Sequence, residues 1–397
     1  MGVQGPQVLT ASTCDVVVAG GGPAGLLAAR DLAAGGLHVI LLEEHERIGD
    51  PVHCTGVLGL DAFDELRLSR ASILSVVQSA RFVSAAGTEV AVETDHVRAA
   101  VVDRARFDSG LAAAAADAGA RVRTGVRVRR IEAGPSGVTV TASDGQLGAR
   151  AAIVACGASY GLNRTLGLGL PRLLLHSAQV EVPFPPLGHI EVHLGRSVAP
   201  GGFAWIVPFR RGFESFARVG LFCSGDAQPR FDAFAERVCA RFDVDRHWPS
   251  PRIKVLPLAP VSKTWTERVL AVGDAAGLVK PTTGGGIYYG LLTGGLAAEV
   301  LIEALGNDRL DPASLGEYER RWRRRLGSEI RAGLIFRRAV ASLPDPAIEA
   351  LIDLARVDGI VPLLKRTADF NWHGSAAMSL LRHVGFRRLT GVPEGGS

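Results

Sequence analysis

Two glycine-rich segments, about 250 residues apart, constrain the fold of this chain more than any other feature. The first reads GGGPAG at 20–25, directly after the apolar run 16–19 and before an alanine- and leucine-rich stretch, 26–34. The second reads GDAAG at 273–277 and continues into PTTGGG at 281–286. Each is predicted to join a strand to a helix through a tight turn.

The first turn suits a pyrophosphate. The amino-terminal end of a helix presents unpaired N–H groups and the positive end of the helix dipole. Glycines leave room for the phosphates because no Cβ blocks their approach. We therefore predict that a dinucleotide contacts Gly20, Gly22, Pro23, Ala24 and Gly25. The alternative is a tight turn without a ligand.

An acidic residue lies where a ribose-binding acid is expected. The apolar run 39–42 ends at Glu43, eighteen positions after Gly25, and Glu44 follows it. A carboxylate here accepts hydrogen bonds from the adenosine ribose and disfavours a 2′-phosphate. We therefore predict FAD or NAD at this site, with Glu43 and Glu44 among its contacts.

The second segment favours FAD. In flavoproteins such a Gly-Asp pair places the aspartate on the ribityl chain, and the next helix points its amino-terminal end at the pyrimidine edge, where reduction builds negative charge. Gly273 and Asp274 are assigned these roles, although Asp274 acting only as a helix N-cap is an alternative. Backbone that passes close to the isoalloxazine ring is predicted at Gly284, Gly285, Gly286 and Ile287.

The composition agrees with an α/β protein of two or three packed units. The chain has 397 residues, 47% of them hydrophobic, and 48 glycines. A net charge of +4 gives no reason to expect nucleic-acid binding. Five cysteines without paired spacing suggest a reducing, cytoplasmic compartment and no metal site of the zinc type. Residues 1–12 do not resemble a secretion signal, and no run of eighteen apolar residues predicts a membrane span.

The order of strand-like and helix-like runs predicts that one domain is built from two separate segments of the chain. We expect a mixed α/β (α+β) fold with a Rossmann-like FAD-binding domain from 13–172 and 254–305, part of the substrate sheet being near 78–100. Residues 173–253 are predicted to form a β-rich substrate-binding domain. The remaining residues, 306–397, are predicted to form a C-terminal helical region.

A third segment, DRARFD at 103–108, precedes an alanine-rich helix. Arg104 is predicted to form a salt bridge with the dinucleotide, or alternatively to cap that helix. Together with the two glycine-rich segments and Glu43, this segment resembles FAD-dependent oxidoreductases of the p-hydroxybenzoate hydroxylase superfamily. The resemblance covers roughly residues 14–340 and implies a flavoenzyme.

Two further segments are similar to the geranylgeranyl reductase branch of that superfamily. PVHCTG at 51–56 resembles the branch's Cys-x-Gly-Gly segment beside the flavin. FAWIVP at 203–208 resembles its substrate-pocket motif, Tyr-x-Trp-x-Phe-Pro. The chain departs from the family pattern at Val57, Phe203, Val207 and Gly285.

The resemblance implies reduction of carbon–carbon double bonds in an isoprenoid chain of the geranylgeranyl type. FAD-dependent monooxygenation of a lipophilic or aromatic molecule is the alternative, although Cys156-Gly157 stands where hydroxylases have Asp-Gly. Flavin halogenases need a lysine in the N-terminal half, whereas the first lysine here is Lys254. The sequence leaves open whether NADPH, an electron-donor protein or another carrier reduces the flavin, because no second nucleotide motif is visible.

Reduction of an isolated alkene needs a hydride on one carbon and a proton on the other. Cys54 is the candidate general acid, because a thiol is protonated at neutral pH, and packing under the flavin is the alternative role. The neighbouring His53 either assists it or is structural. Phe203 and Trp205 alternate on a predicted strand, so both face one side, where aromatic rings stabilise a cation-like carbon or simply form core.

The C-terminal region carries an amphipathic helical pattern. Five arginines between 320 and 325 surround an apolar stripe. Such a helix either lies on anionic lipid, which gives a membrane-associated protein, or packs its stripe on the flavin domain. The stripe consists of Leu315, Tyr318, Trp322, Leu326, Ile330 and Leu334.

Overall fold

The computed structural model describes residues 14–94, 99–357, 360–367 and 369–383. Its largest sheet has eight strands: β1 (Cys14–Ala19), β2 (Val39–Leu42), β8 (Arg121–Arg123), β9 (Val128–Gly134), β10 (Gly137–Ala142), β11 (Gly145–Val154), β17 (Trp265–Thr266) and β18 (Val269–Ala271). The order β18-β11-β1-β2-β8 is parallel throughout, and β9 and β10 extend it as an antiparallel meander. This mixed α/β architecture confirms the predicted fold class.

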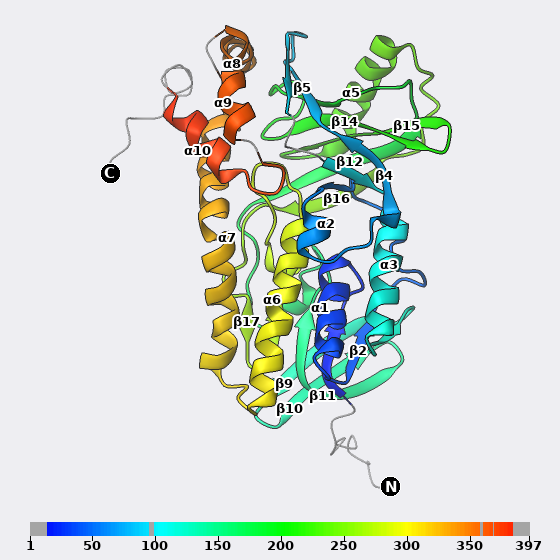
Figure 1. The fold of residues 1–397 in the computed structure, drawn as a ribbon, viewed down its shortest axis with the longest axis vertical. Coiled ribbons are helices and arrows are strands. Elements are labelled where there is room, and N and C mark those ends of the chain that lie inside the picture. The colour runs from blue at the N-terminus through cyan, green and yellow to red at the C-terminus, as the bar shows by residue number, and fades with distance from the viewer. Residues whose placement is uncertain (1–13, 95–98, 358–359, 368, 384–397) are drawn as a thin grey trace.

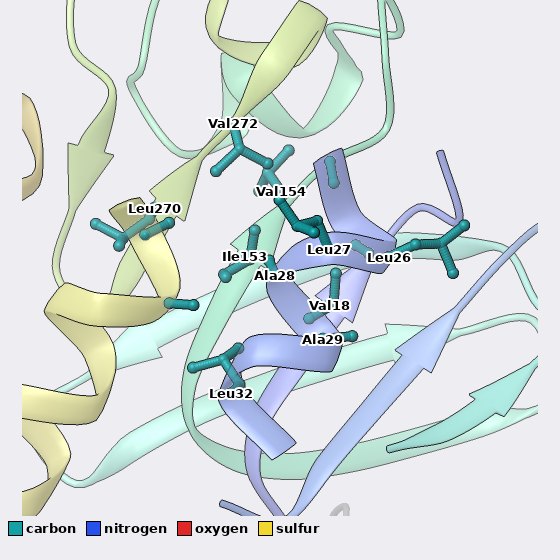
Figure 2. Close-up of a cluster of buried hydrophobic side chains, with 14 of the residues drawn as sticks. Val18, Leu26, Leu27, Ala28, Ala29, Leu32, Ile153, Val154, Leu270 and Val272 are labelled. Carbon is teal, nitrogen blue, oxygen red and sulfur yellow. The ribbon is translucent and has the colours of Figure 1, made fainter. Parts of the chain in front are cut away.

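Helix α1 (Pro23–Ala34) follows β1 because the apolar strand leads into a glycine turn with proline at the start of the helix. Helix α6 (Ile287–Gly306) packs beside α1, and Gly294 permits this approach, since a Cβ there would lie 2.3 Å from the carbonyl oxygen of Ala24. Figure 2 shows buried residues of this core: Val18, Leu26, Leu27, Ala28, Ala29, Leu32, Ile153, Val154, Leu270 and Val272.

A second sheet has seven strands: β5 (Ser79–Val83), β6 (Glu89–Glu93), β12 (Leu174–Pro183), β13 (Ile190–His193), β14 (Phe203–Arg211), β15 (Glu214–Cys223) and β16 (Arg252–Pro257). Their order is β16-β12-β15-β14-β13-β5-β6, so three separate parts of the chain build the sheet. It lies at the opposite end of the molecule from β9 and β10 (Figure 1).

The sequence interpretation of 173–253 as β-rich misses one helix, α5 (Ala227–Phe242), which packs on the second sheet. Asp226 caps this helix by accepting a hydrogen bond from the N–H of Gln228. The sequence signal for this helix was the helical spacing of four apolar residues that the fold buries: Phe231, Phe234, Ala235 and Val238.

A small three-stranded sheet packs against β14. Its strands are β3 (Val57–Gly59), β4 (Ile73–Val77) and β7 (Ala99–Val102). Strand β7 leads into helix α3 (Arg104–Asp117), which packs on α1. The shorter helical elements are α2 (Ala62–Glu65), η1 (Arg70–Ser72), α4 (Gly161–Thr165) and η2 (Gly273–Ala276).

Helix α7 (Pro312–Val340) runs beside α6 (Figure 1). Five residues of its predicted apolar stripe, from Leu315 to Ile330, are buried, and Leu334 is half-buried against the same core. The hydroxyl of Tyr318 donates a hydrogen bond to the carbonyl of Ala271 at 2.8 Å. The stripe is therefore covered by the core of the largest sheet and is not free to lie on lipid. Three helices follow: α8 (Asp345–Val357), α9 (Ile360–Thr367) and α10 (Gly374–Arg382).

One described helix, α6, is long and apolar enough to cross a membrane by length and composition alone. Most of that helix is buried within the protein, and its first turn borders the cavity described below. It is thus packed as a core helix.

Candidate active site

A cavity of about 810 Å³ is lined by residues of both large sheets and of the loops between them. Every site residue predicted from the sequence lines this cavity except Gly25. The fold therefore brings together Gly20, Gly22, Pro23, Ala24, Glu43, Glu44, His53, Cys54, Arg104, Phe203, Trp205, Gly273, Asp274, Gly284, Gly285, Gly286 and Ile287.

The turn at 20–25 borders open space at the start of α1. Gly20 has φ +116°, and a Cβ there would lie 2.3 Å from the carbonyl oxygen of Ala155. At Gly22 a Cβ would meet nothing within 4 Å, and no side chain caps α1. Gly25 instead packs beneath the turn, where a Cβ would lie 2.2 Å from the Gly20 oxygen. Gly25 therefore does not line the cavity, and its contact with a ligand stays a prediction.

Glu43, which follows β2, is largely buried and holds the glycine turn. Its Oε2 accepts a hydrogen bond from the N–H of Gly21 at 2.6 Å, and its Oε1 accepts one from the N–H of His45 at 3.0 Å. Glu44 pairs with Arg127 at 3.3 Å. The carboxylate of Glu43 therefore orders the turn while lining the cavity, and its contact with a ribose stays a prediction.

The second motif places a carboxylate beside the start of α6. Asp274 lies within η2, whereas the N-cap of α6 is Gly286, so the N-cap interpretation of Asp274 is wrong. A Cβ at Gly286 would lie 2.6 Å from Oδ1 of Asp274, so a larger residue there would displace the carboxylate. No side chain caps α6, and its first turn has no acidic residue. Its positive end therefore borders the cavity.

Three residues that the sequence did not single out surround Asp274. The hydroxyl of Tyr160 donates to the Asp274 carbonyl at 2.9 Å, and Nδ2 of Asn163 donates to the Ala275 carbonyl at 2.8 Å. Burial, aided by Asp274, raises the pKa of Tyr160, so its hydroxyl stays a donor. The ammonium of Lys254 lies 3.7 Å from Oδ2 of Asp274. These contacts fix η2 in place.

Cys54 lies on the loop before β3, and Arg218 of β15 holds that loop. Sγ of Cys54 accepts a hydrogen bond from the N–H of Gly56 at 3.3 Å. Arg218 is 1% exposed and donates to the carbonyls of Thr55 at 2.6 Å and Val102 at 3.0 Å. Gly56 has φ +66°, and a Cβ there would lie 2.5 Å from Nη1 of Arg218. The second sheet thus positions the Cys54 loop.

Arg104 begins α3 and lies near Cys54. It forms an ion pair with Asp108, one turn later, at 2.7 Å. Burial opposes its charge, but Asp108 and Cys54 outweigh this effect and raise the pKa of Arg104 above its ordinary value. Asp103 caps α3 by accepting from the N–H of Arg106, so the capping alternative for Arg104 is wrong. Its salt bridge to a dinucleotide stays a prediction.

His53, next to Cys54, carries a polar atom without a partner. Its Nδ1 is buried and has no hydrogen-bond partner in the described part of the protein. Burial, followed by the charge of Lys254, lowers the pKa of His53, so the ring is neutral near pH 7. An unsatisfied buried atom at the cavity is the kind of group that a bound molecule satisfies.

The second sheet presents an aromatic face to the cavity. Phe203 and Trp205 lie two residues apart on β14, so their side chains share one face, as predicted. The Phe203 ring packs edge-on against Phe222 at 4.6 Å between centroids, and Nε1 of Trp205 donates to Gln179 at 3.2 Å. Neighbouring apolar residues on this face are Val207, Ile190 and Val192.

The segment 369–373, between α9 and α10, borders another side of the cavity through Phe370 and His373. Asn371 is fully buried and accepts a hydrogen bond from the N–H of Gly59 at 3.3 Å. Trp372 packs edge-on against Tyr288 of α6 at 5.5 Å. The predicted helical tail therefore also contributes to the site, through Phe370 and His373.

Residues 13–157 match the FAD binding domain family. Digeranylgeranylglycerophospholipid reductase 2 of Methanothermobacter thermautotrophicus is 33% identical over 364 residues, which cover 85% of this chain and 90% of that protein. The digeranylgeranylglycerophospholipid reductase of Methanocaldococcus jannaschii is 30% identical over 366 residues, covering 87% and 92%. The chain belongs to the geranylgeranyl reductase family of FAD-dependent oxidoreductases. The resemblance inferred from the motifs is confirmed.

Solved structures show the same fold as this geranylgeranyl reductase family member. A geranylgeranyl bacteriochlorophyll reductase-like protein from Thermoplasma acidophilum has a TM-score of 0.81 at 23% identity, covering 96% of this chain and 99% of that one. The halogenase PltM has a TM-score of 0.69 at 18% identity, covering 95% and 85%. At these identities the likeness concerns the fold alone.

The residues of this reductase-family protein fit FAD. Two helices without side-chain caps, α1 and α6, begin at one cavity, which suits a pyrophosphate and a ring that gains negative charge. The space at Gly22 and the unpartnered Nδ1 of His53 are consistent with an occupant. We expect Glu43 and Asp274 to bind the ribose and the ribityl chain.

Sequence reasoning missed several cavity residues of this family member. Lys254 and Lys280 are two of only four lysines, and Lys280 lies directly between the two glycine-rich halves of the second motif. Rarity and position were therefore the available signals for the lysines. Arg218 and His373 reach the site only through long-range contacts, so no local pattern marks them.

Proposed function

We propose that this protein saturates carbon–carbon double bonds in the prenyl chains of a polar isoprenoid lipid. The observation that carries the proposal is that one continuous cavity joins the predicted FAD site to an aromatic sheet face. The two relatives named above as digeranylgeranylglycerophospholipid reductases support a geranylgeranyl-type chain on a phospholipid. When bound, reduced FAD supplies the hydride.

The protein's own residues supply an aromatic wall beside the predicted FAD site. The rings of Phe203 and Trp205 bind the chain and stabilise positive charge that develops on an alkene carbon. Of the proton donors predicted from the sequence, His53 is neutral and therefore a weak acid near pH 7. The sequence-based assignment of Cys54 as the donor stays a prediction: if Cys54 gives the proton, Cys54→Ala lowers turnover without loss of bound flavin.

Product mass tests the proposed function. Dithionite-reduced, FAD-loaded protein is incubated without oxygen with prenyl phospholipids, prenyl alcohols, quinones and aromatic polyketides. Reduction adds two mass units per saturated bond, whereas the monooxygenase alternative adds sixteen after air is admitted. A prenyl phospholipid that gains no mass while an aromatic compound gains sixteen units would overturn the proposal.

The electron donor and the location are further parts of the proposal. We propose that NADPH or an electron-donor protein reduces the flavin, which anaerobic mixing with each donor tests by loss of flavin colour.

We also propose a cytoplasmic protein with a peripheral membrane contact. Phe213, in the turn between β14 and β15, is 98% exposed and follows Arg210 and Arg211, which supports contact with anionic lipid. Weaker sedimentation of Phe213→Ser with anionic vesicles tests this contact.

A further inference from the structure

A lysine is buried in the wall of the cavity. Lys280 is 5% exposed and lies just before the PTTGGG loop. The backbone N–H of Lys280 donates to the carbonyl of Gly285 at 3.1 Å, and the backbone carbonyl of Lys280 accepts from the N–H of Gly284 at 2.8 Å. These bonds close the loop that leads into α6 and fix the backbone that carries the amine.

The C-terminal segment holds this amine. Nζ of Lys280 donates to the carbonyl of Phe370 at 2.5 Å and lies 4.8 Å from the centre of its ring. His373 lies beside them: Nε2 is 2.9 Å from the same carbonyl, and Nδ1 is 2.5 Å from the hydroxyl of Thr282. A carbonyl only accepts, so Nε2 carries the proton and Nδ1 accepts from the hydroxyl. Burial lowers the pKa of His373 to about 3, so the ring stays neutral.

No described carboxylate is close enough to pair with Lys280. Burial lowers the pKa of Lys280 to about 7. The surrounding carboxylates raise this pKa, but they do not offset the effect of burial. A buried amine without an ion pair is costly, and such groups are concentrated at functional sites. The charged groups on the packed elements are Asp61, Glu329 and Asp369, with Arg337 bound to the carbonyl of Pro281.

We propose that Lys280 is the general acid that delivers the proton for alkene reduction, with Phe370 and His373 as positioning residues. The inference rests on the proposed function. As one alkene carbon takes the hydride, the Nζ–H bond breaks and its proton forms a C–H bond at the other carbon. The electron pair stays on Nζ, and the neutral amine regains a proton from water. An acid that titrates near the working pH is best suited to this transfer.

The titration of Lys280 can be measured without turnover. The FAD-loaded protein is prepared with lysine labelled with 13C at Cε, and its NMR spectrum is recorded from pH 5 to pH 11. Only four lysines contribute signals, and the one missing in Lys280→Met is that of Lys280. We expect the Lys280 signal to titrate near pH 7. Titration of Lys280 above pH 9 would overturn the inference.

Turnover gives the second readout. Above pH 7, kcat of the wild type should fall about tenfold per pH unit, because the deprotonated amine has no proton to give. Lys280→Met should lower kcat at pH 7 by roughly 100-fold to 10,000-fold, retain flavin and lack this pH dependence. Lys280→Arg should also be slow, because a guanidinium does not release its proton. The exposed Lys263→Met is the matched control and should behave as wild type.

The variants separate this inference from the proposed function. If the wild type reduces prenyl lipid and Lys280→Met is within twofold of it, Lys280 is not the acid and the proposed function stands. The inference would also be overturned if kcat still fell above pH 7 in Lys280→Met but no longer fell in Cys54→Ala. That result would assign the proton to Cys54. A wild type that reduces no prenyl lipid overturns both.

Discussion

Arg218 links the second sheet to the loop that carries Cys54, and replacing it by methionine should destabilise the protein by about 3 kcal/mol. The change leaves the carbonyls of Thr55 and Val102 without their donor. Each buried acceptor left unsatisfied costs roughly 1–3 kcal/mol. The ion pair with Glu181, whose side chain is 31% exposed, adds at most about 1 kcal/mol. Burial lowers the pKa of Arg218, because the charged guanidinium is poorly solvated inside the protein. Removing the charge therefore recovers part of the free energy that the lost hydrogen bonds cost.

Urea unfolding at pH 7 measures the free energy, with the exposed Arg210→Met as the matched control that should stay within about 0.5 kcal/mol of wild type. The freed loop should also let iodoacetamide alkylate Cys54 faster, as read by peptide mass mapping. An Arg218→Met protein with wild-type stability and unchanged alkylation of Cys54 would refute the positioning role of Arg218.

Three other substitutions probe separate parts of the account. Gly20→Ala should abolish FAD binding, measured by flavin fluorescence, because its Cβ would collide with backbone, whereas Gly110→Ala on α3 meets nothing and should bind normally. Arg241→Met should destabilise the protein by about 2 kcal/mol at pH 7, since it removes the arginine partner of the buried Glu191 and leaves only its contacts with His189 and His193. Burial raises the pKa of Glu191, but its histidine and arginine partners outweigh this effect and lower the pKa. The stabilisation is therefore present above pH 4.5 and is lost as the pH falls through the pKa of Glu191 in the folded protein. Equal loss of stability on acidification in the wild type and in Arg241→Met, measured by urea titration, would contradict this. Trp372→Ala should lower the melting temperature and weaken FAD retention together, because it releases the segment that walls the cavity; unchanged FAD retention would refute that role.

The flavin-binding half of the site was predictable because its signals are local. An apolar strand, a glycine turn and a helix follow one another within the first motif, and each specifies its neighbour's geometry. Phe203 and Trp205 were also predictable as one face, because strand alternation alone fixes it. Only Gly25 among the predicted site residues does not line the cavity, since its close packing beneath Gly20 depends on the finished turn.

The remainder of the site depends on contacts between distant parts of the chain. Arg218 meets Thr55 across 163 positions, and Lys280 meets Phe370 across 90. No periodicity or turn chemistry encodes such pairs. The apolar stripe of α7 was ambiguous for a related reason, because the same pattern serves a lipid surface or a protein core. Its burial against the core of the largest sheet follows from tertiary packing.

The central claim is that a prenyl lipid and the flavin exchange reducing equivalents within one cavity. Anaerobic mixing of the dithionite-reduced, FAD-loaded protein with a digeranylgeranyl phospholipid tests it most directly, with flavin absorbance and lipid mass followed in the same sample. The account predicts that oxidised flavin returns in step with lipid saturation, one flavin for each bond reduced. A flavin that stays reduced until oxygen is admitted, with the lipid unchanged, would contradict it.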